Sequence, residues 1–246
     1  MTAPGPLLAA RFIQRPNRFL VEARLMASGL KVTAHLADPG RLGELLLEGA
    51  ELRLRPVKAG AMRKTRFSAA LVRSPHEPYP WVSLDTTLPN RLAADLIEAG
   101  RLPGVGSGWS VKREVRFGSS RFDLQLTRRC HPSLIIEVKS VTLVSRGLAL
   151  FPDAPTLRGT RHLRGLIRLL ENGFQTMVLF VVQRHDAVSV EANRVKDPAF
   201  AGVLEEAAAA GVRLRAVKYR LDASGRAFFQ GSLPVRSHSS GHPPVP

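Results

Sequence analysis

Three ionisable residues stand in two segments that are otherwise apolar and that have the pattern of β-strands. Side chains alternate across a strand, so residues 121–126 (RFDLQL) place Asp123 on the face opposite their apolar side chains. In residues 135–140 (IIEVKS), Glu137 and Lys139 project from one face. Charged groups among apolar neighbours are costly to retain unless they are used. The arrangement is typical of a site that binds a divalent cation and cleaves phosphodiester bonds.

Each of these groups has a chemical role in such a site. The carboxylates of Asp123 and Glu137 are hard oxygen ligands that suit Mg²⁺ or Mn²⁺, and the carbonyl of Val138 adds a third oxygen. The Lys139 ammonium would stabilise an attacking hydroxide and the charge that builds on phosphorus. The alternative is a cross-strand ion pair on a solvated sheet face. The order of strands and helices around these residues favours the metal site.

Other charged residues are secondary candidates. Glu114 lies on the strand before Asp123, where a hairpin would bring it to the metal; a pair with Lys112 or Arg116 is the alternative. Basic side chains gather in the first half of a helix expected at residues 157–171, and they either bind an anion with the free backbone N–H groups or form a solvated face. They are Arg158, Arg161, His162 and Arg164.

The charge balance indicates a polyanionic partner. The chain has 36 basic and 20 acidic residues, a net charge of +16, and only seven of the basic residues are lysine. Arginine suits bidentate phosphate contacts. A genome of biased base composition would also favour Arg over Lys, but it does not explain the net charge.

Several classes of protein are disfavoured. Cys130 is the single cysteine, so an intramolecular disulfide is excluded, and no paired Cys or His spacing indicates zinc. No apolar run approaches the roughly 18 residues of a membrane span, and residues 1–10 lack the basic start of a secretory signal. We expect a soluble cytoplasmic protein that does not bind membranes.

Short β segments separated by Gly, Pro and Asp turns fill the first third of the chain. Their number and spacing predict a small five-stranded barrel, of which the oligonucleotide-binding (OB) type is one candidate, with a single helical turn at residues 40–47. We expect this domain at residues 1–84. The strands are expected at Phe19–Met26, Leu30–Leu36, Glu51–Val57, Ser68–Arg73 and Trp81–Leu84.

The pattern changes after Pro89 to helix, three strands, helix, strand, helix, strand. This order predicts a mixed sheet flanked by helices over residues 85–231, and the Pro-, Ser- and His-rich residues 232–246 are expected to be disordered. The helices are expected at residues 90–99, 157–171 and from Asp197-Pro198, and the strands at 110–117, 121–126, 134–141, 176–182 and 212–221.

The chain resembles the sugar fermentation stimulation protein A (SfsA) family from about Arg18 to Tyr219. Separate motifs in the same order carry this resemblance: Asp38-Pro39-Gly40-Arg41-Leu42, Arg63-Lys64-Thr65, Asp85-Thr86 with Pro89-Asn90, Ser120-Arg121-Phe122-Asp123, residues 137–143 (EVKSVTL), residues 151–154 (FPDA) with Thr156 and Arg158-Gly159, and Val182-Gln183-Arg184. The chain differs from the family pattern at Leu157, where relatives commonly carry Glu, and at Leu124-Gln125, which are usually more hydrophobic.

The resemblance implies an N-terminal OB-like barrel and a C-terminal nuclease-like domain of the PD-(D/E)xK class, with Asp123, Glu137 and Lys139 at the signature positions. It implies DNA as the partner. We keep RNA as an alternative partner, and we expect a homodimer because nuclease-fold proteins that cut both strands often dimerise. A non-catalytic DNA-binding regulator of sugar metabolism on the same fold is the competing interpretation. The basic residues expected to bind nucleic acid are Arg41, Arg63, Lys64, Arg121, Arg158 and Arg161.

Overall fold

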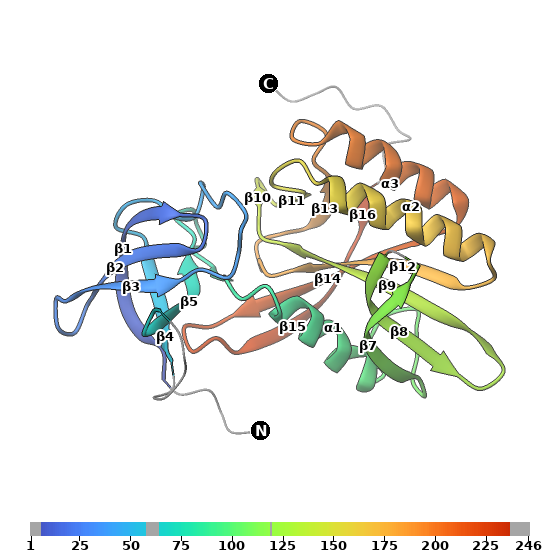
Figure 1. The fold of residues 1–246 in the computed structure, drawn as a ribbon, viewed down its shortest axis with the longest axis horizontal. Helices are drawn as coiled ribbons and strands as arrows, with labels where there is room; N and C mark the ends of the chain where they lie inside the picture. Colours follow the sequence, from blue (N-terminus) through green and yellow to red (C-terminus); the bar gives the residue numbers. More distant parts are fainter. Residues whose placement is uncertain (1–5, 58–63, 119, 237–246) are drawn as a thin grey trace. The chain divides into compact units, whose positions relative to one another are not determined.

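The computed structural model describes residues 6–57, 64–118 and 120–236 (Figure 1). These residues form two compact units. The first contains residues 6–57 and 64–88 together with Val182–Asp186 and Lys218–Gly231, and the second contains the other described residues. The first unit thus combines the N-terminal part of the chain, where we expect the barrel domain, with two later segments.

The first unit contains a closed barrel. Strands β1 to β6 have the order β3-β2-β1-β4-β5-β6, and a parallel pairing of β3 with β5 closes the ring over β1 to β5. The expected OB-like five-stranded barrel is therefore confirmed, and β6 extends it beside β5. The strands are β1 (Leu8–Asn17), β2 (Leu20–Leu25), β3 (Lys31–His35), β4 (Glu51–Pro56), β5 (Phe67–Arg73) and β6 (Trp81–Ser83).

One of the five strands predicted for the barrel is wrong. The sequence pattern did not predict β1, and the predicted fifth strand is β6, which lies outside the closed ring. Strand β1 is hard to recognise because only Ala10 and Phe12 are fully buried and its register with β2 shifts twice. The expected helical turn is present as one turn, in which Leu46 N–H donates to the carbonyl of Leu42 at 2.8 Å.

A six-stranded mixed sheet has the order β15-β14-β12-β9-β8-β7; most of it belongs to the second unit, and residues 218–231 of β14 and β15 are counted with the first. Helices α2 and α3 lie side by side on one side of this sheet, and α1 lies on the other (Figure 1). A smaller sheet has the order β10-β11-β13-β16. The helices are α1 (Leu88–Glu98), α2 (Leu157–Glu171) and α3 (Pro198–Ala210). The strands are β7 (Ser110–Phe117), β8 (Ser120–Arg128), β9 (His131–Val141), β10 (Val144–Ser145), β11 (Leu148–Phe151), β12 (Gln175–Val182), β13 (Ser189–Ala192), β14 (Arg213–Leu221), β15 (Ala227–Leu233) and β16 (Val235–Arg236).

The expected disordered tail begins too early. Strand β15 continues to Leu233, and β16 pairs in parallel with β13 through Val190 and Val235. A two-residue strand is too short for its composition to distinguish it from a Pro- and Ser-rich tail. Residues 237–246 lie outside the described part of the chain. No helix among the described residues is long and apolar enough to cross a membrane.

One carboxylate fixes the starts of two helices. Asp197 caps α3 by accepting from Phe200 N–H at 2.9 Å, and it also accepts from Thr156 N–H at 2.7 Å. Thr156 is in turn the N-cap of α2, since its hydroxyl accepts from Gly159 N–H at 3.0 Å. These bonds satisfy N–H groups that have no partner inside a helix. They therefore set where α2 begins relative to α3.

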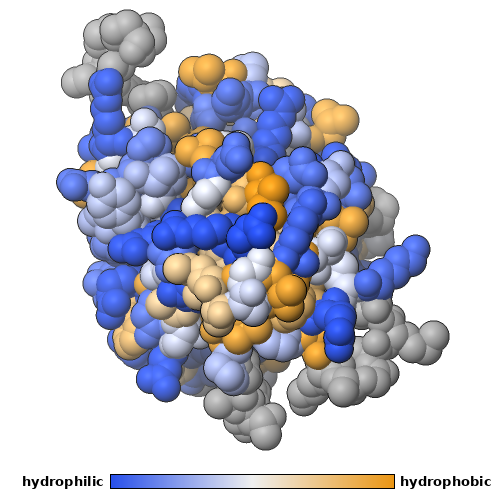
Figure 2. All heavy atoms as spheres, turned by 90° about the vertical axis from the view of Figure 1, so that its left-hand side faces the viewer, coloured by the Kyte–Doolittle hydropathy of each residue, from blue (hydrophilic) through white to orange (hydrophobic). Residues whose placement is uncertain are grey.

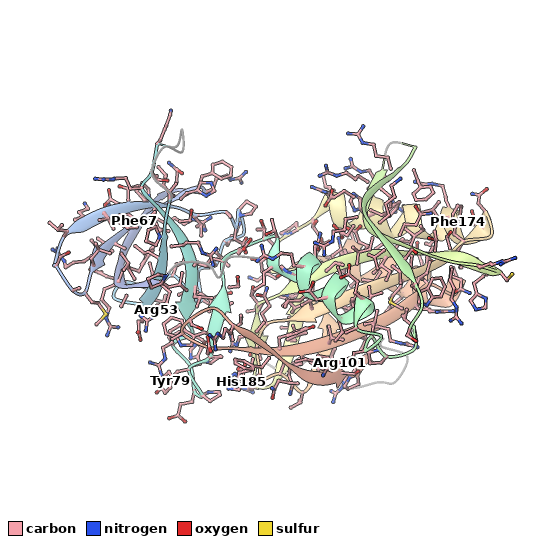
Figure 3. The ribbon with its side chains drawn as sticks, turned by 90° about the horizontal axis from the view of Figure 1, so that it is seen from below. Arg53, Phe67, Tyr79, Arg101, Phe174 and His185 are labelled. Atoms are coloured by element: carbon pink, nitrogen blue, oxygen red, sulfur yellow. The ribbon has the colours of Figure 1, made fainter. Side chains whose placement is uncertain are left out.

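Helix α2 packs closely on β8 at Gly165. A Cβ at this position would lie 2.9 Å from the ring of Phe122, a buried residue of β8. Phe122 belongs to an aromatic group in which Phe117 packs edge-on against Phe174 with ring centroids 5.2 Å apart. Phe174 is labelled in Figure 3. Glycine thus permits an approach that a methyl group would block.

We predict opposite effects for alanine at two helical glycines. Gly165→Ala should lower the free energy of unfolding by about 1–3 kcal/mol, because the methyl group overpacks Phe122. Gly202→Ala on α3 is the matched control, since a Cβ there meets nothing within 4 Å. It should raise the stability by about 0.5–1 kcal/mol through helix propensity. Urea unfolding measures both values, and equal shifts in the same direction would contradict the close approach.

Candidate active site

The main-chain pairing of β8 with β9 ends beside Asp123. The register runs from Arg128 and His131 to Leu124 and Ile136. Beyond that point Val138 N–H donates to Oδ2 of Asp123 at 2.7 Å, so a side chain replaces a main-chain acceptor. The carboxylate therefore lies between the two strands. Since the N–H and C=O of one strand residue point to the same side, the Val138 carbonyl also faces β8.

Helix α1 holds the other oxygen of this carboxylate. Asn90 donates from Nδ2 to Oδ1 of Asp123 at 2.8 Å. Together with Val138, it gives each oxygen of Asp123 one neutral donor. The carboxylate is thereby oriented without a direct hydrogen bond to a cationic side chain.

The second carboxylate belongs to a buried cluster. Oε1 of Glu137 accepts from Nζ of Lys139 at 2.7 Å and from Nδ1 of His162 at 2.6 Å. Glu137 is 4% exposed, Lys139 9% and His162 3%. The alternative of an ion pair on a solvated sheet face is therefore wrong. The Nζ of Lys139 also lies 5.9 Å from the centre of the Phe151 ring.

The other oxygen of Glu137, Oε2, is buried and has no hydrogen-bond partner among the described residues. A buried ionised oxygen without a partner costs roughly 1–3 kcal/mol or more. A divalent cation would supply the missing partner, and oxygen is the ligand that Mg²⁺ and Mn²⁺ prefer. The residues present thus fit such an ion.

The two carboxyl groups have different affinities for a proton. The pKa of Asp123 is raised to about 6, because burial and, after it, the negative charge of Glu137 outweigh the hydrogen bonds from Val138 and Asn90. Burial would also raise the pKa of Glu137, but the hydrogen bond from His162 and the charge of Lys139 outweigh it and hold that pKa below its ordinary value. Asp123 is therefore the group that titrates near neutrality.

Two residues of this cluster were not recognised from the sequence. Asn90 was noted only as part of a motif, and His162 was placed with the basic side chains of α2. His162 instead points inward to Glu137 and to Phe122, whose ring centre is 5.6 Å away. The inward direction of His162 could have been predicted from its position four residues before Leu166, because residues four apart lie on the same face of a helix and Leu166 is buried.

The structure does not bring Glu114 to the carboxylates. Its carboxylate instead forms an ion pair with Nε of Arg121 at 2.8 Å, with both side chains about half exposed. A positive φ of 56° at Glu114 interrupts the alternation on which its expected direction depended. Among the described residues, no three His, Cys, Asp or Glu side chains are grouped to hold a metal ion. An ion here would need main-chain oxygen, water or phosphate as further ligands.

The described residues expected to bind nucleic acid are exposed and do not belong to the buried cluster. Arg121 is exposed on β8 and forms the ion pair with Glu114. Arg158 and Arg161 are exposed on α2, Arg41 and Lys64 are exposed on the barrel, and Arg63 lies outside the described residues. Leu157 is 90% exposed, so it is not part of the buried set.

Comparison with known proteins identifies two family domains in this chain. Residues 13–84 match the model of the SfsA N-terminal OB domain, and residues 87–225 match that of the sugar fermentation stimulation protein RE domain. The chain belongs to the SfsA family. Two similar SfsA-family relatives are the sugar fermentation stimulation protein homologs of Moorella thermoacetica and Chloroflexus aurantiacus. The first is 48% identical over 89% of this chain and 92% of its own length, and the second is 42% identical over 92% and 84%.

A solved SfsA structure has the same fold. It is that of Pyrococcus furiosus SfsA in complex with Ca²⁺, which is 30% identical, has a TM-score of 0.84, and matches over 94% of this chain and 96% of that one. The OB-like barrel and the mixed sheet flanked by helices are thereby confirmed for this SfsA-family chain.

The raised pKa of Asp123 predicts a pH-dependent loss of stability in metal-free protein. Between about pH 4 and pH 6 the native state keeps a proton that the unfolded state releases, so stability falls as the pH rises through this window. Asp123→Asn should therefore raise the free energy of unfolding by about 1–3 kcal/mol at pH 8 and by much less at pH 4. Denaturation in EDTA at both values measures this. Asp95→Asn, which changes an exposed carboxyl of α1, is the control. A gain for Asp123→Asn that is independent of pH would contradict the assignment.

Proposed function

We propose that this SfsA-family chain hydrolyses phosphodiester bonds of DNA with Mg²⁺ or Mn²⁺ at Asp123, Glu137 and Lys139. The observation that carries the proposal is Oε2 of Glu137, which is buried and has no hydrogen-bond partner among the described residues. The second carboxylate, that of Asp123, is oriented by hydrogen bonds from Val138 and Asn90. The Ca²⁺ complex of the Pyrococcus furiosus relative supports the use of a divalent ion. Asp123, Glu137 and the Val138 carbonyl would hold that ion, as in the PD-(D/E)xK pattern that the sequence resembles.

A bound cation would supply a Lewis acid for a phosphate oxygen and would lower the pKa of its bound water. The protein's own residues prepare the site for this. His162 and Lys139 share one oxygen of Glu137, which leaves Oε2 for a further partner and fixes the carboxylate between two donors. The Lys139 ammonium carries the positive charge of this cluster, and it would stabilise the negative charge that develops on the phosphoryl group.

Asp123 makes the activity depend on pH. With a pKa of about 6 it is mostly ionised at neutral pH and mostly protonated at pH 5. A protonated carboxyl group is a poor ligand, so activity should rise with pH through this range.

The surface charge supports DNA as the partner. The net charge of +16 and the exposed arginines of α2 suit the phosphate backbone, and they carry no sequence preference by themselves. RNA as a second substrate and a homodimer remain proposals, which substrate comparison and measurement of molecular mass in solution would test.

The test is a cleavage assay on single-stranded DNA, duplex DNA and RNA with Mg²⁺, Mn²⁺ or EDTA. We predict cleavage that EDTA abolishes and that Asp123→Asn and Lys139→Met each reduce by at least about 100-fold. Glu114→Gln is the matched control, because it removes a strand carboxylate outside the cluster, and it should retain near-normal activity.

Binding must be measured beside cleavage. If Asp123→Asn and Lys139→Met bind DNA normally in EDTA, their losses arise in the chemical step. If the unmodified protein binds DNA in a salt-sensitive manner and does not cut any substrate with either metal, the nuclease proposal is wrong. The chain would then be a non-catalytic DNA-binding protein on a nuclease-like fold.

A further inference from the structure

The barrel carries a basic cleft that is separate in the chain from the carboxylate site. Its volume is about 350 Å³, and it lies between the β1–β2 turn and the segment that follows β3. Figure 2 faces the barrel and shows long hydrophilic side chains spread between small hydrophobic patches. The lining residues are Arg15, Asn17, Arg18, Pro39, Gly40 and Arg41.

Arg15 holds the two walls of this cleft together. Its guanidinium donates to the carbonyls of Gly40 at 2.7 Å and Arg41 at 2.8 Å on one wall. It also donates to the carbonyls of Arg18 at 2.9 Å on the other wall and Asp38 at 3.3 Å. A planar fork with several fixed donors can make such a set of bonds, whereas a lysine ammonium cannot reach them all. Both terminal nitrogens of Arg15 are therefore engaged by main-chain carbonyls, while its Nε is buried without a hydrogen-bond partner among the described residues.

The wall after β3 is further fixed by its own residues. The Asp38 carboxylate accepts from Gly40 N–H at 2.8 Å, which closes a tight turn. Leu42 follows with φ of 51° and is 1% exposed, so it anchors this segment in the barrel core. The main chain of this wall is therefore held in place, and the cleft beside it is shallow and largely open to solvent.

Arg18 and Arg41 present their charges in this cleft. Each is exposed, and neither forms an ion pair with a carboxylate in the part of the chain that the structure describes. The amide oxygen of Asn17 accepts from Phe19 N–H at 2.9 Å, which leaves its NH₂ group as a donor on the same wall. The cleft therefore combines two guanidinium groups with a neutral donor, a set that suits a phosphate.

We propose that this cleft binds a backbone phosphate of a nucleic acid strand, through Arg18 and Arg41 on opposite walls. Arg15 is a positioning residue that holds the walls at the required separation. The proposal deepens the DNA-binding part of the proposed function and rests on it, but it does not depend on cleavage.

The binding test uses the full-length protein in EDTA, so that no substrate is cut. Fluorescence anisotropy of a labelled DNA oligonucleotide gives the affinity at several salt concentrations. Arg18→Gln and Arg41→Gln should each weaken binding about three- to tenfold and reduce the slope of log K against log salt by about one. Arg24→Gln is the charge-matched control, since Arg24 is exposed on β2 and bonds to Gly29 outside the cleft.

Three outcomes of this test bear directly on the cleft. Losses at Arg18 and Arg41 that exceed the loss at Arg24 support it. Equal losses in all three variants would show that only net charge matters and would overturn it. Cleavage that depends on Asp123 while the cleft variants bind normally would overturn the cleft and leave the nuclease proposal standing.

Arg15→Lys tests the positioning role without a change in charge. Provided that circular dichroism shows a folded protein, the affinity and the salt slope should both fall, because Arg18 and Arg41 lose their fixed positions. An unchanged slope in the folded variant would contradict this role. If the variant does not fold, Arg18→Gln and Arg41→Gln still decide the proposal.

Inorganic phosphate distinguishes a strand phosphate from a free one. At equal ionic strength, phosphate should displace the oligonucleotide no better than chloride does. Displacement by phosphate at concentrations well below those of chloride would identify a small-anion site and overturn the proposal for a nucleic acid backbone.

Discussion

The buried carboxylate of Glu137 is the interaction on which the arrangement of the second unit depends. An ionised group that is 4% exposed needs partners, and it takes them from Lys139 on its own strand and from His162 on α2. The latter bond requires α2 to lie close to the sheet, which Gly165 permits against Phe122. The caps at Thr156 and Asp197 then fix where the helix begins. Oε2 of Glu137 still has no hydrogen-bond partner in the part of the chain that the structure describes.

The site is organised at a cost to the stability of the metal-free protein. Asp123 interrupts the main-chain pairing of β8 with β9 and is held ionised at neutral pH against burial and the charge of Glu137. Residues selected for stability alone would not place a second carboxylate there. A cation between the two carboxylates would relieve both the repulsion and the missing partner of Glu137. The groups that destabilise the metal-free protein are therefore the same groups that the proposed function uses.

Regular, strongly patterned elements could be predicted from the sequence. The expected bounds of β7 and α2 agree with the structure, and alternation on β8 and β9 correctly identified Asp123, Glu137 and Lys139 as residues with unusual surroundings. Strands β1 and β16 could not be recognised, because one has shifted register and the other has only two residues. The direction of the Glu114 side chain could not be predicted, because a positive φ at this residue interrupts the alternation of the strand. The role of His162 depends on a hydrogen bond to Glu137, which lies 25 residues away in the sequence. Local pattern carries no information on either.

Anomalous diffraction from crystals of the protein soaked in Mn²⁺ would show whether the buried oxygen of Glu137 binds a cation. We expect one strong peak bonded to Oε2 of Glu137, to the Asp123 carboxylate and to the Val138 carbonyl, at about 2.0–2.3 Å. The same crystals of Asp123→Asn should lose or greatly weaken this peak. A peak elsewhere, or occupied metal sites that leave Oε2 of Glu137 unbonded, would contradict the claim that this buried oxygen is held for a cation.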